Sequence, residues 1–74
     1  MKIDVSDYEA KDIIRIIREW AEMTQKEFGE SIYMSRMAIQ YYERGKRRCS
    51  IDTLLKMIRQ HQLKITIEGK EKKG

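Results

Sequence analysis

The sequence predicts a mainly α-helical domain in which four helices are followed by a short β-strand. Apolar residues recur at helical spacing in four segments, and each segment is preceded by a residue that can cap a helix start. Residues 63–68 alternate apolar and polar side chains, as a half-buried strand does. The 74 residues suffice for a single domain, 1–74, with its helical core in residues 8–62. A partner subunit would add stability to so small a core.

The first helix is expected to begin after Ser6 and to run to about Glu22. Ser6 and Glu9 have the spacing of a capping box, in which hydroxyl and carboxylate each satisfy a backbone N–H group. One face of this helix is apolar and consists of Ile13, Ile16, Ile17, Trp20 and Ala21. We expect this face to pack in the core rather than to hold a cofactor.

A second helix is expected right after Met23, where Thr24 and Glu27 repeat the capping-box spacing. Its inward-facing residues are Phe28, Gly29 and Ile32. Only Tyr33 and Met34 remain for a turn before the next helix. The second and third helices should therefore be joined by a tight connection.

Ser35 and Ser50 are the expected N-caps of the third and fourth helices. The third helix should stop near Gly45, because glycine tolerates the left-handed backbone that ends many helices. The fourth should end near His61 and Gln62. Its expected inward face consists of Ile51, Leu54, Leu55 and Ile58.

The strand predicted over residues 63–68 needs a partner, because an isolated strand leaves its backbone groups unpaired. Leu63, Ile65 and Ile67 would form its apolar side. The alternating segment Lys2 to Val5, the same strand of a second subunit, or both could pair with it. Residues 69–74 are charged and bounded by glycine, which predicts a frayed tail.

Charge is distributed unevenly along the chain. Residues 36–48 hold five basic and one acidic residue, whereas residues 1–35 hold five basic and eight acidic ones. Cys49 is the single cysteine and His61 the single histidine, so the sequence predicts no internal disulfide, no metal site and no cofactor. The absence of a long apolar run and of a signal-peptide pattern leads us to expect a cytoplasmic protein without membrane association.

The segment beginning at Thr24 resembles the helix-turn-helix of the Xre family, which includes phage repressors and Cro-like proteins. The similarity covers about residues 13–60 and is carried by Thr24-Gln25, Glu27-Phe28, Ile32, Ser35, Ile39 and the turn Glu43-Arg44-Gly45-Lys46. Two positions depart from the family pattern. Tyr33 stands where the turn usually has glycine, and Gly29 where the second helix usually has alanine. A Cro/repressor-like domain that binds DNA is what the resemblance implies.

The resemblance also implies roles for individual residues. The expected base contacts are Arg36, Met37, Gln40 and Tyr41, and the expected phosphate contacts are Gln25, Ser35, Arg44, Lys46, Arg47 and Arg48. Arginine can pair with guanine and glutamine with adenine in the major groove. Tyr42 is expected to pack inward, and Glu43 to pair with a basic side chain such as Arg18.

These expectations favour a transcriptional regulator over an enzyme, since no nucleophile is accompanied by a base. One helix-turn-helix reads few base pairs, so a homodimer on a palindromic operator is expected, acting as a repressor of its own operon. Pairing of the terminal strand between subunits would resemble antitoxin regulators of the HipB type, which adds a toxin as a further candidate partner. The sequence is also compatible with a protein-interaction module on the same fold, with RNA binding, and with a strand that only covers a monomer.

Overall fold

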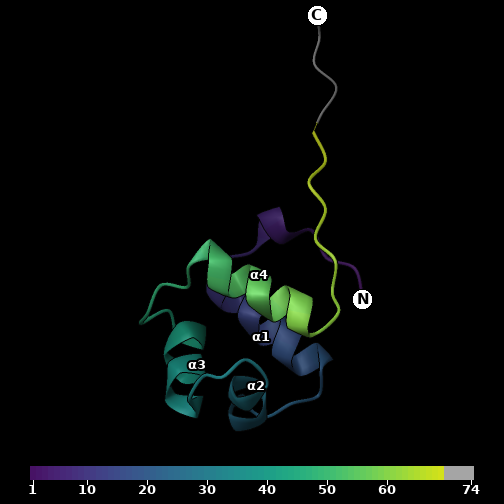
Figure 1. The fold of residues 1–74 in the computed structure, drawn as a ribbon. Helices are drawn as coiled ribbons and strands as arrows, with labels where there is room; N and C mark the ends of the chain where they lie inside the picture. Colours follow the sequence, from purple (N-terminus) through teal and green to yellow (C-terminus); the bar gives the residue numbers. More distant parts are fainter. Residues whose placement is uncertain (70–74) are drawn as a thin grey trace, which may run out of the picture.

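The computed structural model describes residues 1–69 and is shown in Figure 1. A short 3-10 helix, η1, precedes four α-helices; their bounds are η1 Val5–Asp7, α1 Ala10–Trp20, α2 Gln25–Ser31, α3 Arg36–Glu43 and α4 Ile51–Gln60. Helix α3 packs against both α2 and α1, and α4 packs along α1. The predicted mainly α-helical class, with four α-helices within the described residues, is confirmed.

The start of α1 differs from the prediction. Ser6 and Glu9 do not form a capping box, because Asp4 binds Ser6 instead: the carboxylate accepts both the backbone N–H of Ser6, at 3.0 Å, and its hydroxyl, at 2.6 Å. These bonds lower the pKa of Asp4 and organise η1. Glu9 becomes the N-cap of α1 without a side-chain hydrogen bond, and the helix ends at Trp20 rather than near Glu22.

The core lies where the four helices meet. Its buried residues are Ile13, Ile14, Ile17, Phe28, Ile32, Ile39, Tyr42, Leu54, Met57 and Ile58. Two predicted members are wrong, since Trp20 and Ile51 are 48% and 63% exposed. Each stands at a helix end, Trp20 as the last residue of α1 and Ile51 as the first of α4. Met57, absent from the predicted inward face, is fully buried in its place.

The predicted caps of the other three helices are confirmed. Thr24 and Glu27 form a reciprocal capping box at the start of α2. Ser35 accepts the N–H of Ala38 at 3.1 Å and so caps α3. The hydroxyl of Ser50 does the same at the start of α4. Three separate polar side chains therefore fix where these helices begin.

The strand expected over residues 63–68 is not formed in this single chain. Within residues 1–69 no β-ladder is present, and Val5, expected in the pairing strand, belongs to η1 instead. The 3-10 turn engages the carbonyl groups of Asp4 and Val5, which accept the N–H groups of Asp7 and Tyr8 and so are not available to a neighbouring strand. After α4 the N–H of Leu63 still donates to the carbonyl of Ile58, at 2.9 Å, and the chain beyond it extends from the domain without a ladder partner among the described residues (Figure 1). Of the tail predicted at 69–74, residues 70–74 lie outside the described part of the chain.

Candidate nucleic-acid interface

Helices α2 and α3 form one closely packed unit. Phe28 and Ile39 are fully buried between the helices, and Ile32 is nearly so. The backbone N–H of Met34 donates to the carbonyl of Gly29 at 2.8 Å, which closes the turn. A Cβ atom on Gly29 would lie 2.5 Å from the carbonyl oxygen of Met34, so the connection needs glycine there.

Tyr33 occupies the left-handed backbone region of this turn, with φ of +61°. The family usually has glycine at this position, and the turn keeps the backbone conformation that favours glycine although tyrosine occupies it. Its ring is 92% exposed and lies 5.7 Å from the ammonium group of Lys56 on α4. This contact joins the turn to α4, which sequence reasoning did not foresee because the two residues are far apart in the chain.

One face of α3 is open to solvent. The four residues expected to contact bases all lie on it: Arg36 and Met37 begin the helix, and Gln40 and Tyr41 follow one turn later. Arg36 is exposed, Met37 and Tyr41 are 52% and 40% exposed, and Gln40 is half-buried. The opposite face carries the buried Ile39 and Tyr42. Because the face with Ile39 and Tyr42 is buried in the core, the face with Arg36 and Gln40 is directed toward solvent.

The predicted pair of Arg18 and Glu43 is present, with Nε of Arg18 2.7 Å from Oε2 of Glu43. Gln25, expected at a phosphate, lies at the same cluster: its amide nitrogen is 3.5 Å from Oε1 of Glu43. Gln25 is thus held at the start of α2 by a residue from the end of α3. Ser35, also expected at a phosphate, is exposed, and its oxygen accepts the cap hydrogen bond of α3.

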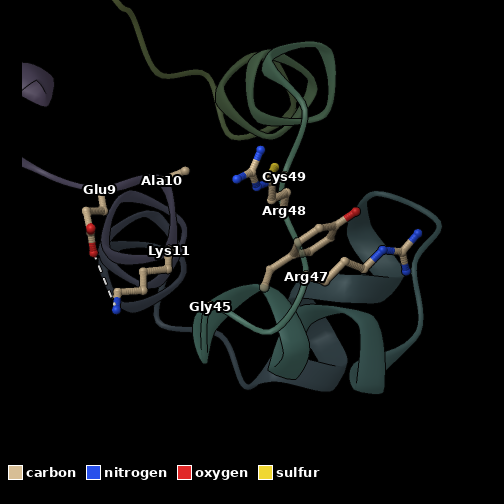
Figure 2. A pocket seen from close by; sticks show the side chains of 8 residues that line it. Glu9, Ala10, Lys11, Gly45, Arg47, Arg48 and Cys49 are labelled. Atoms are coloured by element: carbon tan, nitrogen blue, oxygen red, sulfur yellow. Dashed lines mark ion pairs between the residues drawn. The ribbon is translucent and has the colours of Figure 1, made fainter.

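A basic loop, residues 44–48, follows α3. Arg44 ends the helix, and Gly45 has φ of +72°, as the predicted helix stop required. The exposed cations of the loop are Arg44, Lys46, Arg47 and Arg48. The guanidinium carbon of Arg47 lies 5.3 Å from the centre of the Tyr42 ring, which stacks this cation on the end of α3. Figure 2 shows Arg47 and Arg48 leaving the loop in opposite directions.

A family model described as helix-turn-helix, of the Xre and Cro-like type, matches residues 14–67. The chain belongs to this helix-turn-helix family. At family level it is a DNA-binding transcription regulator. Neither a search of curated proteins nor a search of solved structures gave a significant match.

The helix-turn-helix protein has a further cation beside the basic loop. Lys11 of α1 lies against Gly45, where its Cδ would be 3.2 Å from a Cβ atom on the glycine. Lys11, Gly45, Arg47 and Arg48 are among the residues around a shallow pocket of 310 Å³ (Figure 2). Glu9 lies 3.4 Å from the Lys11 ammonium and offsets part of its charge. Only packing of α1 on α3 brings Lys11 here, so no sequence signal pointed to it.

Cys49 and His61, the single cysteine and the single histidine, are both partly buried and contact neighbouring residues of the fold. Cys49 is half-buried before α4, and burial raises the pKa of its thiol, which disfavours the reactive thiolate. His61 stacks on Phe28 at 4.8 Å between ring centres, and its Nε2 is 3.0 Å from the Ser31 hydroxyl. Across residues 1–69, no three His, Cys, Asp or Glu side chains are grouped to hold a metal ion. None of the helices in that range has the length and apolar character needed to cross a membrane.

Proposed function

We propose that this protein is a sequence-specific regulator that binds double-stranded DNA as a homodimer and represses its own operon. The observation that carries the proposal is the exposed face of α3, where Arg36 and Gln40 are flanked by the basic loop. A helix with one buried and one polar face, followed by cations, has what is needed to enter a major groove and hold the adjacent backbone.

Base recognition is assigned to the first two turns of α3. Arg36 can donate two hydrogen bonds to guanine O6 and N7, a pair that contributes roughly 1–3 kcal/mol of discrimination. Gln40 can pair with adenine. Met37 and Tyr41 lie beside them and can pack on a thymine methyl group or donate a hydroxyl hydrogen bond.

Phosphate contacts are assigned to the starts of α2 and α3 and to the basic loop after α3. Gln25 and Ser35 stand at the two helix starts, and Arg44, Lys46, Arg47 and Arg48 at the end of α3. Phosphate contacts do not depend on the base sequence of the DNA. Each of the four cations also adds to the salt dependence of binding, because a cation that neutralises a phosphate releases a counterion from the DNA. Stacking on Tyr42 restricts Arg47 before DNA arrives.

The dimer and the palindromic operator follow from the small footprint of one helix-turn-helix. Two copies related by a two-fold axis would place two α3 helices in successive major grooves, about 34 Å apart. Repression of its own operon is the regulatory outcome we propose, because a dimer bound across a promoter blocks access to it.

The first experiment measures fluorescence-anisotropy binding to DNA from upstream of the protein's own gene and to a scrambled duplex, each across a salt series. Tighter binding to the upstream DNA, weakening steeply with salt, is expected. No binding to either duplex at low salt would overturn the proposal and favour a protein-interaction module. Specific binding that is lost when a co-expressed partner protein joins the regulator would add the antitoxin role.

Two variants separate readout from positioning. Arg36→Ala should lower the preference for the upstream DNA about tenfold or more, while its binding to the scrambled duplex changes little. Lys46→Gln should weaken binding to both duplexes and reduce the salt slope by about one. Arg59→Ala, an exposed cation at the end of α4, is the matched control and should leave sequence preference unchanged. An Arg36→Ala protein with full preference would remove the assigned readout.

A further inference from the structure

A groove with an apolar floor lies on the side of α1 and α4. It has a volume of 1120 Å³, and its walls are the chain ends, residues 1–6 and 62–68. The floor consists of Ile13, Ile17, Trp20 and Ile58. Trp20 remains 48% exposed at the edge of this floor. A large aromatic side chain left open beside apolar neighbours favours contact with another apolar surface.

The apolar side chains of the C-terminal wall become more exposed to solvent along the segment, from Leu63 to Ile67. Leu63 packs against the core, Ile65 is 38% exposed and Ile67 is 94% exposed. Side chains two residues apart share a side of an extended segment, so the apolar side begins on the domain and continues beyond it. In Figure 1 the segment leaves α4 extended, and among the described residues its backbone has no ladder partner.

The sequence of this segment is complementary to itself. When two copies are aligned antiparallel about Thr66, Lys64 of each lies opposite Glu68 of the other, and Ile65 opposite Ile67. Opposite charges and β-branched pairs directly across a ladder are the favourable combinations. The N-terminal segment is a poorer partner, because the backbone carbonyls of Asp4 and Val5 already accept the N–H groups of Asp7 and Tyr8 at η1. A second copy of this chain is the occupant that fits.

We propose that residues 64–68 of two chains pair as an antiparallel ladder centred on Thr66, with the apolar sides over the two grooves. Ile67 of each chain then lies beside Ile65 of the other, next to the groove floor that includes Trp20. The pairing rests on the dimeric state proposed above and specifies its interface and register. It leaves α3 free, because the groove includes no residue of that helix.

Disulfide trapping tests the register without disrupting the pair. Thr66→Cys in a Cys49→Ala background should form a covalent dimer under mild oxidation, because directly opposed residues have Cα atoms about 4.5–5.5 Å apart. Lys64→Cys in the same background is the matched control. In this register its two copies are four residues out of alignment, roughly 14 Å apart, and should not cross-link. A mixture of Lys64→Cys and Glu68→Cys proteins should cross-link to each other.

Charge reversal tests the pairing in solution. Lys64→Glu places glutamate opposite Glu68 at both ends of the ladder and should raise the dimer dissociation constant roughly tenfold, measured by sedimentation. Lys64→Glu combined with Glu68→Lys restores opposite charges and should restore dimerisation. Failure of the double variant to recover would count against the register.

The outcomes separate this inference from the proposed function. Specific DNA binding without a Thr66→Cys cross-link would overturn the strand pairing and leave the regulator standing. A Thr66→Cys dimer that binds no DNA would support the interface and overturn the regulator. A monomer without cross-link, at concentrations well above those used for binding, would favour pairing of the segment within one chain or with a different protein and would also overturn the inference.

Discussion

Arg18 on α1 and Glu43 at the end of α3 form a bidentate ion pair, with N–O distances of 2.7 and 2.9 Å. The side chains are 18% and 7% exposed, and the hydrogen bonds to Glu43 raise the pKa of Arg18. A third donor of Arg18 reaches the carbonyl of Met23 at 3.1 Å. One guanidinium thus ties together α1, the α1–α2 connection and α3, and Gln25 shares the same carboxylate. The pair fixes the end of α3 from which the basic loop emerges.

Glu43→Ala is expected to lower the free energy of unfolding by about 2–3 kcal/mol. The guanidinium of Arg18 would remain mostly buried without its counter-charge, which costs more than the pair itself contributes. Urea unfolding measures the change. The double variant Arg18→Met with Glu43→Leu should be less destabilised than Glu43→Ala, since no charge is left unpaired. Equal losses in the two proteins would contradict this explanation.

Gly29→Ala is expected to destabilise the protein by about 1–3 kcal/mol, although alanine favours helices more than glycine does. The added Cβ would lie 2.5 Å from the Met34 carbonyl oxygen and 3.2 Å from that of Ser35, and neither backbone atom can move without shifting the start of α3. Thermal unfolding measures the loss. Glu30→Ala, at the neighbouring exposed position of α2, provides the control and should change stability little. A more stable Gly29→Ala protein would show that the turn adjusts easily.

Tyr33→Gly is expected to stabilise the fold by about 0.5–1 kcal/mol. Removing the Cβ relieves the left-handed backbone at φ of +61°, and this gain exceeds the loss of the exposed Lys56 contact. Tyr33→Ala loses the ring but keeps the strain, so it should not be stabilised. Urea midpoints of the three proteins distinguish the effects; a stable alanine variant would point to the ring rather than to the backbone.

The unfolding free energy is expected to fall between pH 7.5 and pH 5 partly through His61. Burial lowers the pKa of His61 below its ordinary 6.5, so the folded protein binds this proton less readily than the unfolded chain does. The contribution of neutral His61 is therefore complete above about pH 6.5 and is lost as the pH falls below that value. His61→Phe, which can keep the stack on Phe28, should show a smaller pH dependence. Parallel curves for the two proteins would exclude this contribution.

Most helix caps could be predicted from the sequence, because a cap depends on residues that are close together in the chain. Thr24, Ser35 and Ser50 cap their helices through bonds that span three residues, and the pattern predicted them correctly. The same rule failed at Ser6, where Asp4 offered a closer acceptor. Periodicity likewise placed Ile17 and Ile58 in the core, but it could not show that Trp20, the last residue of α1, would remain 48% exposed.

For the candidate site, the sequence by itself determined the order of the helices, the polar face of α3 and the basic loop after it, since helical periodicity and capping act over a few residues. Only the tertiary structure decided which distant groups meet: Lys11 beside Gly45, Gln25 on Glu43, and Lys56 over Tyr33. Those contacts depend on the angles and separations at which α1, α3 and α4 pack. Packing geometry is set by the whole core at once, so no local pattern specifies it.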